Sequence, residues 1–135
     1  MDKKLTIYTD GCSKGNPGPA SIGVVIYEND NQNPCLMLSD EIGITTNNQA
    51  EYKALIKALE YAVAMKASEV EVRSDSELIV NQMNGRYRVK KEELKPLHAE
   101  AQRLSGQINK FRILAIPREE NRGADKLANM AFSKK

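Results

Sequence analysis

Apolar residues recur with a period of two in the first third of the chain and with helical spacing in much of the rest. Residues 5–9 are short and apolar on both faces, residues 20–28 alternate, and residues 35–43 suit a third extended segment. Turn-forming residues fill the two intervals, 11–19 and 29–34. We therefore expect three strands in an antiparallel meander.

The first predicted helix follows this meander directly. Residues 46–49 have capping-box form, with a hydroxyl followed three residues later by a glutamine. An apolar stripe at helical spacing then runs through Leu55, Ala58, Leu59 and Ala62. Glu51 lies four residues before Leu55 and so falls on the same stripe. We expect its carboxylate to face the core, which no surface salt bridge explains.

Strands and helices alternate in the remainder of the chain. Residues 70–73 and 111–116 suit strands, and residues 74–77 form a second capping box that would begin a short helix. Apolar stripes predict two more helices, over 94–108 and 124–131. Alternation of this kind favours parallel pairing with right-handed crossovers. The pattern predicts an α/β fold with a mixed five-stranded sheet flanked by helices, in a single domain over residues 1–135.

Composition narrows the class of protein only slightly. Hydrophobic residues make up 41% and charged residues 28%, and the formal net charge of +2 is too small to identify a polyanionic partner. No apolar run approaches the roughly 18 residues that span a bilayer, and no signal-peptide core is present. Cys12 and Cys35 lack metal-site spacing, so we expect two free thiols. We expect a monomeric cytoplasmic protein with no membrane association.

Four acids stand out by their placement. Asp10 and Asp75 end predicted strands, Glu51 faces inward, and Asp125 lies in the first turn of the last helix. A turn, a helix cap or the helix dipole would each explain one of these acids by itself, Glu51 excepted. If the four converge, they require cations, and oxygen ligands alone favour Mg²⁺ or Mn²⁺. Two ions about 4 Å apart would suit in-line attack on a phosphodiester.

Four motifs resemble type 1 ribonuclease H, in its compact form without the basic protrusion. They are Thr9-Asp10-Gly11 with the following glycine-rich turn, residues 45–51, Ser74-Asp75-Ser76, and residues 121–128. The resemblance implies the ribonuclease H-like fold, with sheet order 3-2-1-4-5 and strand 2 antiparallel. It also implies hydrolysis of the RNA strand of RNA–DNA hybrids, leaving 5′-phosphate and 3′-hydroxyl ends. The family's catalytic and metal-binding quartet falls on Asp10, Glu51, Asp75 and Asp125.

The resemblance also suggests where the hybrid would bind. Residues of the glycine-rich turn and of the first helix start occupy positions that line the minor groove in the family, near RNA 2′-hydroxyls: Gly11, Asn16, Asn47, Asn48 and Gln49. Short amides suit a 2′-hydroxyl because they both donate and accept. Turn formation and helix capping would account for the same residues without a ligand.

Two departures from the family pattern affect the site prediction. Where many relatives carry a histidine, the loop over residues 116–121 offers Arg118, which would attract a scissile or product phosphate. The single histidine, His98, is expected at the surface. In place of the basic protrusion stands a short connector over residues 86–91, whose Arg86 and Arg88 flank Tyr87 and would hold the DNA backbone. A solvated loop cation and a solvated charge run are the alternatives.

Other functions share parts of this pattern. A catalytically weak hybrid-binding module of the same fold would keep the motifs, and a transposase or integrase core would use a similar acidic site. The intact quartet argues against the first, and the segment over residues 45–52 argues against the second. A purely structural domain remains the weakest alternative.

Overall fold

One five-stranded mixed sheet, in the order β3-β2-β1-β4-β5, organises the computed structural model, which describes residues 3–133. The strands are β1 (Lys4–Ser13), β2 (Gly18–Glu28), β3 (Leu36–Thr45), β4 (Glu69–Ser74) and β5 (Lys110–Ala115). β1 pairs antiparallel with β2 and parallel with β4, β2 pairs antiparallel with β3, and β4 pairs parallel with β5. The predicted sheet order and the antiparallel second strand are confirmed.

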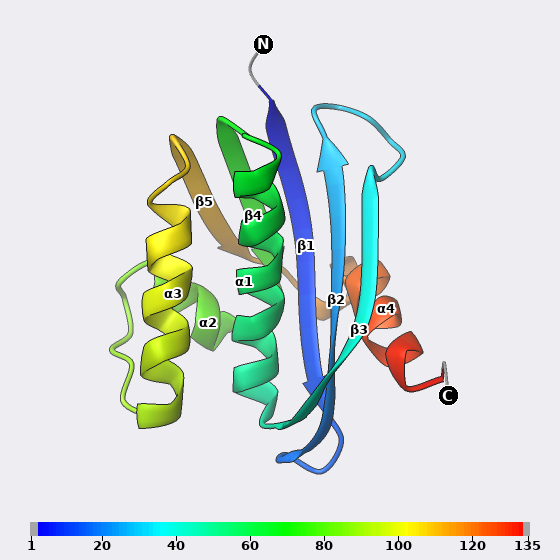
Figure 1. Cartoon of the computed structure of the whole chain (residues 1–135), viewed down its shortest axis with the longest axis vertical. Coiled ribbons are helices and arrows are strands. Elements are labelled where there is room, and N and C mark those ends of the chain that lie inside the picture. The colour runs from blue at the N-terminus through cyan, green and yellow to red at the C-terminus, as the bar shows by residue number, and fades with distance from the viewer. Residues whose placement is uncertain (1–2, 134–135) are drawn as a thin grey trace.

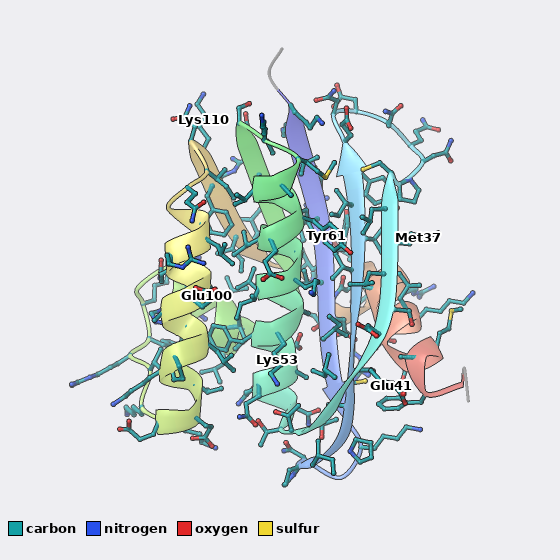
Figure 2. All side chains as sticks on the ribbon, viewed as in Figure 1. Met37, Glu41, Lys53, Tyr61, Glu100 and Lys110 are labelled. Carbon is teal, nitrogen blue, oxygen red and sulfur yellow. The ribbon has the colours of Figure 1, made fainter. Side chains whose placement is uncertain are left out.

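Helices cover the sheet unequally on its two faces. Figure 1 shows α1 (Asn47–Ala64) and α3 (Lys95–Ser105) on one face and α4 (Arg122–Ser133) on the other, behind β2 and β3. The short α2 (Glu77–Met83) follows β4, and single 3₁₀ turns occupy Glu92–Leu94 and Arg118–Glu120. Figure 2 shows Lys53 and Tyr61 on α1 and Glu100 on α3, with Met37 and Glu41 along the edge strand β3. No helix among residues 3–133 is long and apolar enough to cross a membrane.

The main core lies between the sheet and the α1–α3 layer. Its largest buried side chains include Leu5, Ile7, Leu55 and Leu59, together with Tyr52. The Tyr52 hydroxyl donates to Gln82 Oε1 at 2.6 Å, which satisfies both buried polar groups. His98 Nε2 lies 3.2 Å from the Gln82 carbonyl oxygen, and its ring meets Tyr52 edge-on. The expected surface histidine is half-buried, because one side of its ring contacts Gln82 of α2 and Tyr52 of α1.

Two glycines set how closely the helices approach the sheet. A Cβ on Gly11 would lie 2.3 Å from the Ala50 carbonyl carbon, at the start of α1. A Cβ on Gly23 would lie 2.1 Å from the Ala124 carbonyl oxygen, in the first turns of α4. Both distances are far below van der Waals contact, so any side chain at either position would displace a helix. These two helices carry Glu51 and Asp125.

Two predicted boundaries near the acids differ from the structure. Asp10 does not end its strand, because β1 continues to Ser13 through pairing with β2. Pairing of β1 with β4 stops at Thr9 and Ser74, so Asp10 is the first residue beyond it. The predicted capping box at 74–77 was wrong as well. Ser76 caps α2 by accepting from the Ile79 amide at 3.3 Å, whereas Thr46 and Gln49 form the predicted box on α1.

Candidate metal centre and nucleic-acid interface

Three carboxylates meet where the paired part of β1 and β4 ends. Asp10 and Asp75 directly follow the last residue pair of the two strands, and Glu51 reaches them from α1. One oxygen from each lies within 4.8 Å of the others. The Gly11 amide donates to Glu51 Oε1 at 2.9 Å, which fixes this carboxylate against β1. The main chain therefore brings together three acids that are distant in sequence.

Asp125 and Arg118 complete the wall of the same cleft. The cleft has a volume of about 440 Å³, and its lining includes Asp10, Glu51, Asp75, Arg118 and Asp125. Arg118 Nη2 lies 3.8 Å from Asp125 Oδ1, and the Arg118 side chain is 80% exposed. The structure thus places an exposed cation beside a group of acids, with its guanidinium open to solvent.

Mutual repulsion and burial make these acids difficult to ionise together. Burial, followed by the charges of Asp75 and Asp125, raises the pKa of Asp10 to about 8, while Arg118 opposes the rise. Burial and the Asp10 charge raise the pKa of Glu51 well above its ordinary value, although the Gly11 amide lowers it. Burial likewise raises the pKa of Asp75. A bound divalent cation would remove this penalty, and an oxygen-only ligand set suits Mg²⁺ or Mn²⁺.

The amides predicted to bind substrate are ordered by bonds within the protein. Asn16 Oδ1 accepts from the Asn47 amide at 2.9 Å, and Asn47 Oδ1 accepts from the Ser13 amide at 2.7 Å. Gln49 Oε1 accepts from the Thr46 amide at 3.0 Å as part of the helix cap. The side-chain oxygens of these three residues thus already accept hydrogen bonds within the protein. What each amide can offer a ligand is its NH₂ group, a hydrogen-bond donor.

Asn48 lies beside the basic connector and away from the acids. A second pocket of about 440 Å³ is lined by Asn48 together with Leu78, Arg86, Tyr87, Arg88, Lys90, Lys91 and Leu94. This lining combines two leucines, of which Leu94 is buried, with four cationic side chains. The predicted minor-groove residue Asn48 and the predicted backbone-binding cations therefore share one surface, separate from the cleft that contains Asn47 and Gly11.

Asn121 belongs to the site but was absent from the residues predicted to form it. Its side chain is fully buried, and Nδ2 donates to the Thr9 carbonyl oxygen at 2.9 Å. From sequence, an asparagine just before a helix reads as a cap or a turn residue. Only its place in the motif over residues 121–128 marked it, and that gave no reason to assign it a role beside the acids.

Comparison with known proteins agrees with this geometry. The model of the reverse transcriptase-like family matches residues 8–131. A bifunctional protein of Mycobacterium tuberculosis is 43% identical over 129 residues, which cover 96% of this chain and 35% of that protein. The chain therefore spans about a third of the length of this curated relative.

Two solved structures are similar over nearly their whole length. Ribonuclease H1 of Halobacterium salinarum is 38% identical with a TM-score of 0.93, covering 98% of this chain and 99% of that one. LC11 ribonuclease H1, isolated from compost by a metagenomic approach and solved in complex with an RNA/DNA hybrid, is 47% identical. Its TM-score is 0.89, with 96% and 97% of the two chains covered. The family match and these similarities place the chain in the reverse transcriptase-like family, among the type 1 ribonucleases H.

Proposed function

We propose that the protein is an endoribonuclease that hydrolyses the RNA strand of RNA–DNA hybrids, leaving 5′-phosphate and 3′-hydroxyl ends. The observation that carries the proposal is the convergence of Asp10, Glu51 and Asp75 to within 4.8 Å at the end of the β1–β4 pairing. Similarity to a ribonuclease H1 solved with an RNA/DNA hybrid supports the choice of substrate.

Asp10, Glu51, Asp75 and Asp125 would hold two divalent ions, Mg²⁺ or Mn²⁺. When bound, such ions supply charge neutralisation at the scissile phosphate and activation of the attacking water. The protein's own part is to keep the carboxylates close together, although burial raises their pKa values. Its elements do so through the Gly11 amide on Glu51 and through the close contact of α1 with Gly11.

Recognition of the RNA strand would use the ordered amides. Asn16 and Asn47 present NH₂ donors, because their oxygens are held by main-chain amides. An RNA 2′-hydroxyl oxygen accepts such a bond, whereas DNA carries only hydrogen on the 2′ carbon and has no acceptor there. Gly11 would line the path of the ribose with its backbone, since the space beside its Cα is filled by the start of α1.

Arg118 and the connector over residues 86–91 would bind phosphate groups of the hybrid. Arg118 lies at the cleft rim, where its guanidinium would attract the scissile or product phosphate. Arg86 and Arg88 would hold the DNA backbone, with Tyr87, 52% exposed, as a stacking surface beside Asn48. Binding through such contacts weakens as salt rises.

We also propose that the protein acts as a monomer in the cytoplasm and that residues 1–135 form a single domain. The continuous sheet over β1 to β5 supports one domain. Cys12 and Cys35 are both free, which supports a reducing compartment.

Cleavage of end-labelled substrates tests the activity. The 135-residue protein is incubated with an RNA–DNA hybrid, an RNA duplex and a DNA duplex, in Mg²⁺, Mn²⁺ or EDTA. We expect metal-dependent cleavage of the hybrid alone, abolished by Asp10→Asn and unaffected by Asp30→Asn, a matched change in an exposed turn. Absence of hybrid cleavage with unimpaired binding would favour the weak hybrid-binding module, and equal cleavage of DNA would favour a transposase-like enzyme.

Single-turnover and steady-state rates test Arg118. Arg118→Ala should lower turnover more than it weakens hybrid binding, because a phosphate contact at the rim acts on the reacting or departing group. Lys110→Ala removes an exposed cation from the start of β5, at the opposite end of that strand, and serves as the control (Figure 2). Unchanged turnover in Arg118→Ala would leave this arginine without a catalytic role.

A further inference from the structure

Asn121 is hydrogen-bonded to the segments that carry two of the four acids, Asp10 and Asp125. Its Nδ2 donates to the carbonyl oxygen of Thr9, the residue before Asp10. Its own carbonyl oxygen accepts from the Asp125 amide at 3.0 Å, and its main-chain amide donates to the Arg118 carbonyl oxygen at 2.9 Å. Asn121 thus ties β1 to the first turn of α4 at the point where the catalytic cleft opens.

The same side chain also acts on the third acid. Burial is the largest influence on the Asp75 pKa and raises it, and a hydrogen bond from the Asn121 side chain is the largest influence that lowers it. β1 and β4 are no longer paired after Thr9 and Ser74, so the ladder does not fix the Asp75 backbone relative to Asp10. The Asn121 side chain bonds to Thr9 at this point and lowers the pKa of Asp75, so it acts on both strands where their pairing ends.

Stability alone does not account for an asparagine here. The residue is fully buried, and Oδ1 has no hydrogen-bond partner among residues 3–133. A buried acceptor without a partner costs at least as much as one internal hydrogen bond contributes. Exchanging the amide nitrogen and oxygen would not help, since Oδ1 would then face the Thr9 carbonyl oxygen. The group retained at this cost is the NH₂, which bonds to the Thr9 carbonyl oxygen.

We propose that Asn121 is a positioning residue that holds β1 at Asp10 at a fixed spacing from Asp125 on α4, so that these acids bind the same divalent ions. This inference rests on the proposed function for its consequence in catalysis. It goes beyond that function by assigning a role to a residue that contacts the segments carrying the metal-binding acids and not the substrate. Loss of the NH₂ group would leave β1 at Asp10 free to shift relative to α4.

Two variants and one control separate positioning from packing. Asn121→Asp keeps the size and shape of the side chain but replaces NH₂ with an acceptor, and Asn121→Ala removes it. Asn84→Ala is the control, because Asn84 Nδ2 makes the same kind of bond, to the Ile113 carbonyl oxygen at 3.2 Å, away from the acids. Circular dichroism and Tm in EDTA establish that each variant folds.

Mn²⁺ binding to the protein without substrate is the first readout, measured by calorimetry and by the rise in Tm. We expect both Asn121 variants to bind Mn²⁺ about 10-fold or more weakly, within the range of roughly 10–100-fold typical of residues that orient metal ligands. With hybrid present, kcat should fall by a similar factor while KM for the hybrid stays unchanged. Asn84→Ala should match wild type in both respects.

Wild-type Mn²⁺ affinity in a folded Asn121→Asp variant would overturn the assignment. A rise in KM with unchanged kcat would overturn it too, because that result would make Asn121 a substrate contact. If the wild-type protein binds Mn²⁺ in an Asn121-dependent way but does not cleave the hybrid, the proposed function fails and the positioning role stands.

Discussion

In the metal-free protein, the Asp10 carboxylate should lower the stability of the fold. The folded protein keeps a proton on this carboxyl up to a pKa of about 8, whereas the ordinary value is 3.8. Between these two pH values the folded state binds more protons than the unfolded state, so stability falls as pH rises. Asp10→Asn removes the charge and should therefore stabilise the metal-free protein at pH 8.

The size of this effect follows from the pKa. A shift from 3.8 to about 8 corresponds to about 5–6 kcal/mol of lost stability by pH 8, at about 1.4 kcal/mol for each unit. The amide of the variant must itself be buried, and this cost reduces the gain in stability. We expect Asp10→Asn to gain about 2–4 kcal/mol, or roughly 6–12 °C in Tm.

Thermal unfolding in EDTA from pH 4 to pH 8 measures the effect. Asp10→Asn should be less stable than wild type at pH 4, where only the burial cost of the amide counts, and should become the more stable protein as pH rises, with Asp30→Asn following wild type throughout. Saturating Mn²⁺ should raise the Tm of wild type more than that of Asp10→Asn. An Asp10→Asn variant that is no more stable than wild type at pH 8 in EDTA would refute the electrostatic reasoning.

Three further predictions concern elements around the site. Glu71 is buried, and although burial alone would raise its pKa, Arg73 and Arg112 hold it below 4.5. Its ion pairs should therefore stabilise the fold above that pH, and Glu71→Gln should cost about 1–3 kcal/mol at pH 7 but little at pH 3, by chemical denaturation. Tyr52→Phe leaves Gln82 Oε1 buried without its donor, so we expect a loss of about 1–3 kcal/mol and unchanged Mn²⁺ affinity by calorimetry. Gly23→Ala should cost about 1–3 kcal/mol or more and weaken Mn²⁺ binding, because α4 must move away from β2; a variant with normal Tm and Mn²⁺ affinity would contradict this.

The sequence predicts most of the fold because a local pattern of residues indicates each helix and strand. Alternation in residues 20–28 and the box at Thr46 and Gln49 both correspond to observed elements. What the sequence could not predict depends on neighbouring strands. β1 continues past Asp10 only because β2 offers partners as far as Ser13. The cap of α2 falls on Ser76 because Ser74 is still paired, with Ala115 of β5.

The residues of the site likewise divide into those that local sequence identifies and those that depend on distant segments. Residue type and helical spacing singled out Glu51, and its place among the acids agrees with that interpretation. No local pattern distinguishes Asn121 from an ordinary turn residue, because its role depends on Thr9, 112 residues away. The orientation of the Asn16 and Asn47 amides is also invisible in the sequence, since each depends on a main-chain amide from another segment.

The packing of α4 on the sheet has a consequence for the order of events during biosynthesis. This helix lies across β2, where Ser21 Oγ donates to the Ala128 carbonyl oxygen, and it brings both Asp125 and Asn121 to the cleft. A ribosome makes the chain from the amino terminus, and residues 121–133 are translated after every strand. A nascent or truncated chain that stops before Asn121 contains every strand but lacks Asn121 and one acid of the quartet. The group of four acids is therefore assembled only when the last helix docks, after synthesis has passed the rest of the fold.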